Sequence, residues 1–378
     1  MNILMTNHHL LKFGGTENFT LTAAKGLKKA GHKVTVYSKF IDKLQPFFEH
    51  EEIEVVSDLS LVKDRDFHIA HVHHNISAIE VRFAFPNLPI FYLCHGSLAF
   101  LEKPPVLDIN IALFGAVSPH LVRELRRMKI ADRKIVYFAN VCDEGKFRPK
   151  GKKPNPFPKR ALVLSAKMGM KEETLIRKVC IKLNIKTEFV GGRFGEIAYY
   201  GIPTLINKAD IVFTTGRGVM ETMLCGRTPI VFDVFGGDGM VTPQNFAQLL
   251  SRNFTGKAIG KKYTARELIN EINKYNPEVI DELRNLAIEH FSIQKQIPRL
   301  EKIYRKTIQM HRDRKVRDYE VLKAFVNTIK ATHYQASYMK ISFRKTNHQY
   351  KLKLDEITSS KFYKLWSLYN RVKEIIAK

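Results

Sequence analysis

The sequence predicts an α/β protein of two doubly wound domains, each with a mainly parallel sheet between layers of helices. Short apolar runs of strand length alternate with stretches of helical periodicity along most of the chain. Residues 149–159, with four prolines among basic residues, divide this alternation into two series. The chain of 378 residues is also too long for one ordinary core. We therefore expect domains at 1–150 and 151–293, followed by a basic helical extension at 294–378.

The first domain begins with a β-loop-α-β unit. Residues 2–7 (NILMTN) predict a buried strand, Gly14-Gly15 a turn, residues 16–30 a helix that ends at Gly31, and VTVYS the next strand. Further apolar runs predict strands within 53–57, 67–73, 90–95, 110–118 and 134–140.

The second domain repeats the alternation. Strands are predicted at RALVLSAK, TEFVGG, ADIVFTTG and TPIVFDV, all between residues 160 and 234. Helical patterns cover 171–183, 218–225, 243–252, 264–274 and 277–291. This order predicts a second doubly wound sheet.

Charge and cysteine content restrict partners and compartment. The chain has 62 Lys and Arg against 37 Asp and Glu, a net charge of +25, which favours nucleic acid, an anionic bilayer or phosphate-bearing substrates. Residues 301–378 hold about half of this excess. Four widely spaced cysteines form no metal or disulfide pattern, and no leader or membrane span is visible. We expect a cytoplasmic protein, with attachment to the inner face of the membrane as an open alternative.

The segment 209–226 has the strongest functional signal. A strand leads through a glycine-bracketed turn into a helix, a geometry in which free amide groups can bind a diphosphate. Glu221, in the first turns of that helix, could accept hydrogen bonds from a ribose diol. Gly216, Arg217 and Gly218 are the other candidates for nucleotide binding. An ordinary β-α-β unit with a solvated glutamate is the alternative.

GRGVMETMLCGRTPIVFDVFGG, residues 216–237, resembles the signature of the retaining glycosyltransferases with the GT-B fold (group 1, family 4-like). The matching positions are Glu221, Met223, Cys225, Gly226, Pro229 and Gly236-Gly237. The resemblance implies two Rossmann-like domains facing a cleft, with Glu221 holding the nucleotide ribose. The family's other glutamate is replaced by Phe213, so the residue that contacts the donor sugar is unassigned. Arg217 could instead meet the diphosphate or an acidic sugar.

Matches in the first domain occur in the family's order. FGGTE resembles its Gly-Gly-x-Glu loop, which implies that Gly14 and Gly15 let the backbone approach donor phosphate and acceptor. LCHG resembles its histidine-glycine pair, which implies that His95 contacts the donor sugar as the catalytic candidate. YFANVCDEGKFRP, residues 137–149, resembles the ending of the family's first domain. Glu17 is an acceptor-side candidate.

Other candidates have weaker support. Lys167 and Lys171 resemble the family's diphosphate-binding basic pair, although two solvated lysines are as plausible. His8 and His9, before the glycine loop, are further acceptor-side candidates, with a surface role as the alternative.

We expect no metal site and no cofactor. In HIAHVHH, a strand would send His71 and His73 to one face and His74 to the other, and no acidic residue joins them at ligand spacing. Asp64 and Asp66 precede the strand and are separated by an arginine.

The resemblance implies a retaining, hexosyl-transferring enzyme with a nucleotide-sugar donor and a glycan or lipid-linked acceptor, active in cell-envelope polysaccharide or glycolipid synthesis. The basic extension at 294–378 could bind an anionic membrane or pack back on the first domain, and its last 20 residues predict a basic amphipathic helix. A sugar-nucleotide epimerase or phosphorylase would keep the fold. A basic nucleic-acid-binding protein is the alternative of another class.

Overall fold

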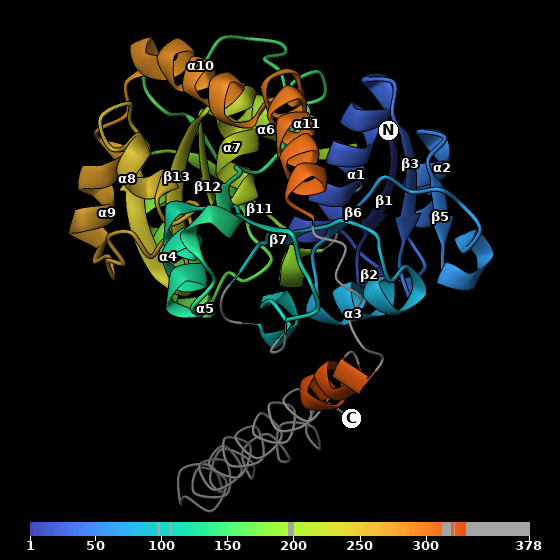
Figure 1. Ribbon diagram of the computed structural model, residues 1–378. Helices are drawn as coiled ribbons and strands as arrows, with labels where there is room; N and C mark the ends of the chain where they lie inside the picture. The colour runs from blue at the N-terminus through green and yellow to red at the C-terminus, as the bar shows by residue number, and fades with distance from the viewer. Residues whose placement is uncertain (97–98, 106–107, 196–199, 312–318, 321, 330–378) are drawn as a thin grey trace, which may run out of the picture. The chain divides into compact units, whose positions relative to one another are not determined.

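The computed structural model describes residues 1–378 except 97–98, 106–107, 196–199, 312–318, 321 and 330–378 (Figure 1). The chain divides into two compact units, residues 1–324 and 325–378. The elements described below belong to the first unit. The amphipathic helix predicted for the last 20 residues lies outside the described part.

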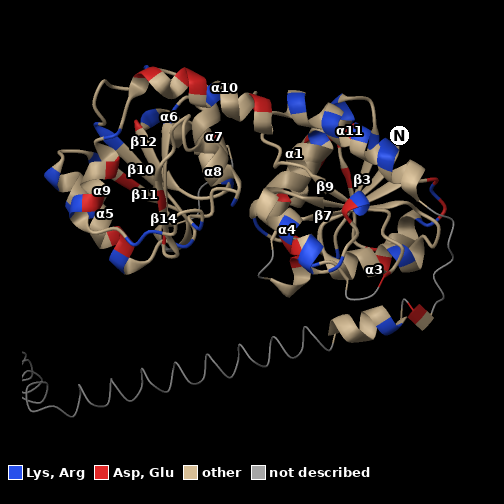
Figure 2. Cartoon of the chain, turned by 60° about the vertical axis from the view of Figure 1, so that its left-hand side comes forward, with Lys and Arg blue, Asp and Glu red and all other residues tan. Residues whose placement is uncertain are grey.

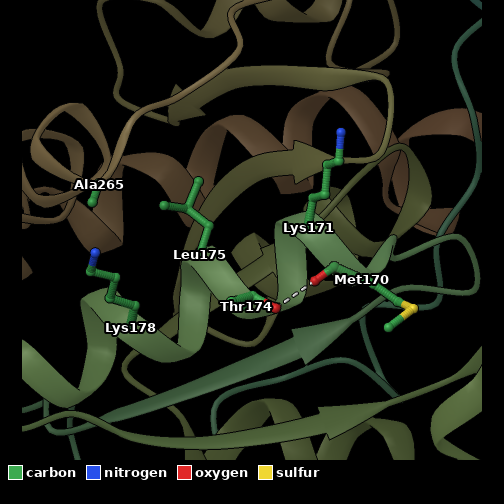
Figure 3. A pocket seen from close by; sticks show the side chains of 6 residues that line it. All are labelled: Met170, Lys171, Thr174, Leu175, Lys178 and Ala265. Carbon is green, nitrogen blue, oxygen red and sulfur yellow. Dashed lines mark hydrogen bonds between the residues drawn. The ribbon is translucent and has the colours of Figure 1, made fainter. Parts of the chain in front are cut away.

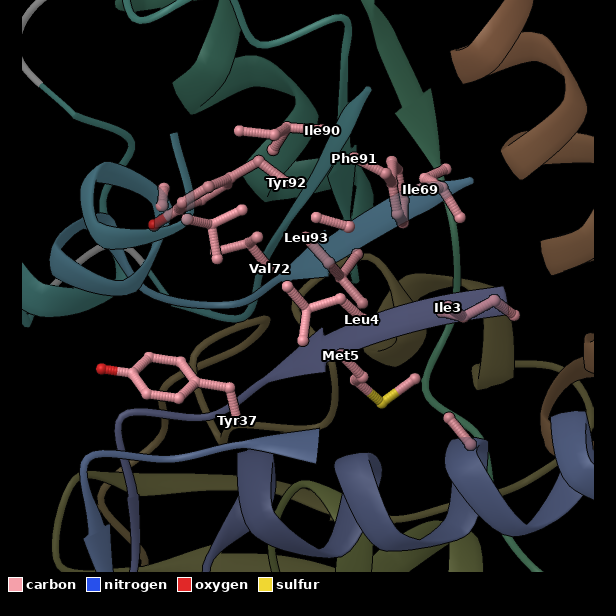
Figure 4. Close-up of a cluster of buried hydrophobic side chains, with 14 of the residues drawn as sticks. Ile3, Leu4, Met5, Tyr37, Ile69, Val72, Ile90, Phe91, Tyr92 and Leu93 are labelled. Atoms are coloured by element: carbon pink, nitrogen blue, oxygen red, sulfur yellow. The ribbon is translucent and has the colours of Figure 1, made fainter. Parts of the chain in front are cut away.

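Seven parallel strands form the first sheet, in the order β5-β3-β1-β6-β7-β8-β9. They are β1 (Asn2–Thr6), β3 (Lys33–Tyr37), β5 (Glu54–Val56), β6 (Ile69–Val72), β7 (Ile90–Cys94), β8 (Leu113–Ala116) and β9 (Ile135–Tyr137). The central strands are buried on both faces, which explains their nearly continuous apolar sequences. Side chains such as Leu4, Ile69 and Phe91 form their core (Figure 4). The predicted parallel sheet is confirmed.

The helices of this region are α1 (Gly15–Lys29), α2 (Gln45–His50), α3 (Asn75–Ala84) and α4 (Pro119–Arg127). Helix α1 is followed by Gly31 with a φ of +84°, so the predicted glycine ending is confirmed. Two-residue strands β2 (His9–Leu10) and β4 (Phe40–Ile41) pair beside the sheet. Short 3-10 turns occur at Leu59–Val62, Phe100–Glu102 and Asp132–Lys134.

The second sheet has the order β11-β10-β12-β13-β14, with β14 antiparallel. Its strands are β10 (Arg160–Leu164), β11 (Lys186–Val190), β12 (Ile211–Thr214), β13 (Thr228–Asp233) and β14 (Gly236–Met240). Gly236 and Gly237, which match a Gly-Gly turn in the sequence signature, begin β14 instead. A Cβ at Gly237 would lie 2.8 Å from the Val231 carbonyl oxygen, so glycine permits this close pairing.

Helices cover both faces of the second sheet. They are α5 (Met170–Lys182), α6 (Ile202–Lys208), α7 (Arg217–Leu224), α8 (Phe246–Leu250), α9 (Ala265–Ile272) and α10 (Ile280–Phe291), with 3-10 turns at Gly192–Phe194 and Pro277–Val279. Neighbouring residues of β12 enter different cores, Val212 with α7 and α10, and Phe213 with α5 and α9. This is the predicted doubly wound arrangement.

Helix α11 (Ile293–Met310) crosses back to the first sheet and packs beside α1 (Figure 1). His32 Nε2 lies 2.7 Å from Glu301 Oε1, and the Tyr304 hydroxyl lies 2.6 Å from His71 Nδ1. We call the first sheet, its helices and α11 the first half, and the second sheet and its helices the second half. The domain bounds given above stay a prediction.

None of the helices in the described part of the chain is both long enough and apolar enough to cross a bilayer.

Candidate functional site

The predicted residues gather where parallel strands end. Loops at the carboxyl ends of parallel strands usually form the ligand site of doubly wound proteins. His8 follows β1, His95 follows β7, Lys167 follows β10 and Gly216 follows β12. Most of the sequence candidates therefore lie at the carboxyl edge of one sheet or the other.

Glycines shape the turn between β12 and α7. Gly216 has φ +59° and ψ −125°, which side chains disfavour, and its amide donates to the Phe254 carbonyl oxygen at 2.8 Å. A Cβ on Gly218 would lie 2.1 Å from Thr214 Oγ1. The turn therefore needs both glycines, and it places Arg217 at the first position of α7.

Arg217 and Glu221 form a buried ion pair one helical turn apart. Arg217 Nε donates to Glu221 Oε1 at 2.7 Å, and the two side chains are 11% and 8% exposed. Arg217 Nη1 donates to the Val141 carbonyl oxygen at 2.8 Å, and Nη2 donates to Thr22 Oγ1 at 3.1 Å. The predicted nucleotide-binding glutamate is thus tied to α1 of the first half.

His95 belongs to the same neighbourhood. Burial and, less strongly, the positive charge of Arg217 lower the pKa of His95 to about 3. Its Nε2 lies 2.9 Å from His73 Nδ1, and burial also holds the pKa of His73 well below its usual value. Two neutral imidazoles share one hydrogen in this contact, so their tautomers must be complementary. From the sequence, His73 was weighed only as a possible metal ligand, so its hydrogen bond with His95 was not predicted.

Lys146 is a second residue that the sequence missed. Burial, opposed by the charge of Glu221 and reinforced by that of Arg217, lowers the pKa of Lys146 to about 7. Its Nζ lies 5.0 Å from the ring centroid of Phe147 and 5.7 Å from that of Tyr200. Lys146 lies inside the matched segment 137–149, which offered a signal for it.

The glycine loop of the first half brings the acceptor-side candidates together. Glu17 is buried, and a Cβ on Gly14 would lie 2.4 Å from its Oε2, so the carboxylate folds over the loop. His9 Nδ1 lies 2.9 Å from Glu17 Oε1. The His8 amide donates to His74 Nδ1 at 3.2 Å. Gly15 begins α1, whose N-terminal cap is Gly14.

The two predicted lysines of the second half have different surroundings. The positive charge of Lys167 interacts with two carboxyls, those of Glu102 in the first half and of Asp233. Burial raises the pKa of each carboxyl, and the lysine charge opposes that rise. Lys171 is exposed on α5 and lines a hollow of ≈ 510 Å³ with residues such as Leu175 and Ala265 (Figure 3). Lys167 is therefore the member of the pair that faces the strand ends.

Strand β6 ends at Val72, so His73 and His74 lie beyond it, but the rings of His71 and His73 lie together against Phe19, as the predicted alternation required. His71, His73 and His74 are all buried. Among the described residues, no group of three or more His, Cys, Asp or Glu side chains is placed to hold a metal ion.

Comparison with known proteins identifies the architecture. The sequence matches no protein-family model, and no curated protein matches it. HepE from Anabaena, solved with UDP and glucose, is similar with a TM-score of 0.59 and 14% identity, over 80% of this chain and 99% of that chain. The catalytic domain of starch synthase IV from Arabidopsis thaliana, bound to ADP and acarbose, has a TM-score of 0.51 and 13% identity, over 82% and 99%. An α-glucosyltransferase in complex with UDP and a 13-mer DNA has a TM-score of 0.52 and 11% identity, over 81% and 99%.

These similarities define the class of fold. The chain has the GT-B fold, with two Rossmann-like sheets, as the sequence resemblance implied.

Proposed function

We propose that the protein is a glycosyltransferase that moves a hexosyl group from a nucleotide-sugar donor to a glycan or lipid-linked acceptor, with retention, in the synthesis of a cell-envelope polysaccharide or glycolipid. The observation that carries this proposal is the buried Arg217–Glu221 pair at the start of α7, at the strand ends of a GT-B fold. The similar HepE structure contains UDP and glucose, which supports a nucleotide-sugar donor.

In this proposal the donor binds against the second half. The Glu221 carboxylate accepts hydrogen bonds from the ribose diol, and the amide groups of Arg217 and Gly218, at the start of α7, meet the diphosphate. Lys167, which already interacts with Asp233 at the end of β13 and with Glu102, stabilises the charge that develops on the leaving diphosphate. Arg217 supports Glu221, and we assign it no donor phosphate.

The first half supplies the sugar and acceptor side. Because burial keeps the pKa of His95 near 3, its imidazole is neutral at pH 7. Its Nε2 is hydrogen-bonded to His73, so Nδ1 is the ring nitrogen left for a sugar hydroxyl. The Gly14-Gly15 loop has no side chains and lets the acceptor approach. Glu17 and His9 form the polar wall beside it. The leaving diphosphate assists attack, so this proposal assigns neither a metal nor a cofactor to the reaction.

The basic residues of α11 favour an anionic membrane surface as a further partner. The lysines and arginines of α11 are exposed, and they appear as the blue segments of that helix in Figure 2. Each such residue near an anionic bilayer adds about 1 kcal/mol of attraction. Co-sedimentation with phosphatidylserine-containing vesicles at low salt tests this contact, and an absence of binding would remove the membrane from the proposal.

Nucleotide binding tests the donor site directly. Isothermal titration with UDP, GDP, dTDP and CMP should identify one nucleotide that binds the wild-type protein. Glu221→Ala should weaken that binding about tenfold or more, because a charge-assisted hydrogen bond contributes about 1.5–3 kcal/mol. Glu188→Ala, an exposed glutamate on β11, is the matched control and should bind as the wild type does. If no nucleotide binds the folded wild type, the proposal fails.

The reaction products separate transfer from the alternatives on the same fold. A transferase releases the nucleotide in proportion to glycosylated acceptor. An epimerase converts the sugar while the nucleotide sugar stays intact, and a phosphorylase depends on inorganic phosphate. Chromatography of the nucleotide products with the identified donor distinguishes the three reactions.

A further inference from the structure

The position of Arg217 is not explained by the stability of its own helix. Arg217 is the first residue of α7, where the helix dipole favours acidic side chains. An arginine four residues before a glutamate is also the less favourable order for such a pair. The contacts that hold Arg217 must therefore come partly from outside α7.

Those outside contacts lie where the chain passes between the halves. The Val141 carbonyl precedes Cys142, whose amide donates to the Phe291 carbonyl oxygen at 2.7 Å. The Ile293 amide donates in turn to the Cys142 carbonyl oxygen at 3.1 Å. The segment that leads from the first half to the second is therefore hydrogen-bonded to the segment that returns into α11, next to the Val141 carbonyl that accepts from Arg217. The third contact, Thr22, lies on α1 of the first half.

The planar guanidinium therefore connects three parts of the molecule. Its Nε fixes one oxygen of the Glu221 carboxylate, while Nη1 and Nη2 reach the crossover peptide and α1. The fork of an arginine is rigid, so fixing two of its nitrogens sets the direction of the third. With an exposure of 11%, the side chain is also largely withdrawn from solvent.

We propose that Arg217 is a positioning residue, which orients the Glu221 carboxylate for the nucleotide and links that carboxylate to the crossover and to α1. Nucleotide occupancy and the arrangement of the two halves are then coupled through one side chain. This inference rests on the proposed role of Glu221 in nucleotide binding. It differs from a direct contact of Arg217 with the diphosphate or an acidic sugar.

A double-mutant cycle distinguishes positioning from direct contact. Arg217→Gln should weaken binding of the nucleotide identified above about tenfold, as expected for loss of a charge-assisted hydrogen bond. In the Glu221→Ala background, Arg217→Gln should change the affinity less than about twofold, because interacting residues are not additive. Arg177→Gln is the matched control, since Arg177 Nε donates to Glu173 Oε1 at 2.8 Å in an exposed i, i+4 pair on α5. A full tenfold effect in both backgrounds would overturn the positioning role.

Hydrogen exchange tests the link to the first half. Nucleotide should slow amide exchange in α1 of the wild type, and this protection should be lost in Thr22→Val, which removes the hydroxyl that Arg217 binds. Thr307→Val on α11 is the matched control, because both hydroxyls also donate to a carbonyl oxygen one helical turn earlier, Thr22 to Asn18 at 2.6 Å and Thr307 to Ile303 at 2.8 Å. Protection of α1 that persists in Thr22→Val and Arg217→Gln would overturn the coupling.

The two proposals can fail separately. Absence of nucleotide binding by the folded wild type would refute the proposed function. Nucleotide binding that is sensitive to Glu221→Ala, together with an additive cycle, would leave that function intact and refute the role of Arg217.

Discussion

Acid should destabilise this protein well above the pH at which carboxylates titrate. His71 and His73 are fully buried, and His74 is 3% exposed. Burial disfavours the imidazolium form, so the pKa values of His71 and His73 lie well below their usual value, and that of His74 is about 3. The destabilisation is expected on a change from pH 7 to pH 5.

The sign of the effect follows from proton uptake. As the pH falls below about 6.5, the unfolded chain binds protons at these histidines while the folded chain does not, so the free energy of unfolding decreases. Each such histidine costs about 1.4 kcal/mol per pH unit below 6.5, or about 2 kcal/mol between pH 7 and pH 5. Three of them cost up to about 6 kcal/mol, which is comparable to the whole stability of many proteins.

Urea denaturation at pH 7 and pH 5 measures this difference. His74→Asn should reduce the loss by about 2 kcal/mol, because asparagine does not titrate. Asparagine also suits the N-cap position that His74 occupies on α3 and can accept the His8 amide. His50→Gln on α2, where the histidine side chain is 72% exposed, is the control and should leave the pH dependence unchanged. A loss below about 2 kcal/mol in the wild type, or an unchanged loss in His74→Asn, would refute the reasoning.

Two further predictions concern the thiols and the glycine turn. Burial raises the pKa values of four buried cysteines, Cys94, Cys142, Cys180 and Cys225. A disulfide reagent at pH 8 should therefore modify none of them before the protein unfolds. Modification of the folded protein would contradict their burial. Gly216→Ala should lower the free energy of unfolding by about 1–3 kcal/mol, because its φ and ψ strain any side chain. Urea denaturation checks this loss, and an unchanged stability would show that the turn tolerates a Cβ.

The sequence could predict the fold where its signals are local. Continuous apolar runs predicted the buried parallel strands, and Gly31 predicted the end of α1. The antiparallel strand β14 was missed because its glycines match a turn motif, whereas their close approach to β13 depends on pairing. The return of α11 to the first sheet was one of the two alternatives that the sequence left open for the basic extension, but its contacts could not be predicted, since His32 and its partner Glu301 are 269 residues apart.

The same distinction applies to the candidate site. Glu221 and its glycine turn lie within a few residues of one another, so their spacing could be recognised. The partners of Arg217 are not local, because Val141 is 76 residues away and Thr22 is 195 residues away. No periodicity encodes such contacts, and a departure from the family motif at Arg217 therefore gave no indication of what the arginine does.

The charges around Glu221 give a reason to expect an anionic ligand that does not depend on motifs. This buried carboxylate interacts electrostatically with two basic side chains, Arg217 and Lys146. Arginine stays charged, whereas burial and Arg217 lower the pKa of Lys146 to about 7, so the lysine is only partly protonated at neutral pH. A diphosphate bound at the start of α7 would favour the charged ammonium, because a nearby anion raises the pKa of a lysine. Binding of an anion would therefore raise the pKa of Lys146 and increase the positive charge of this region, as a nucleotide site requires.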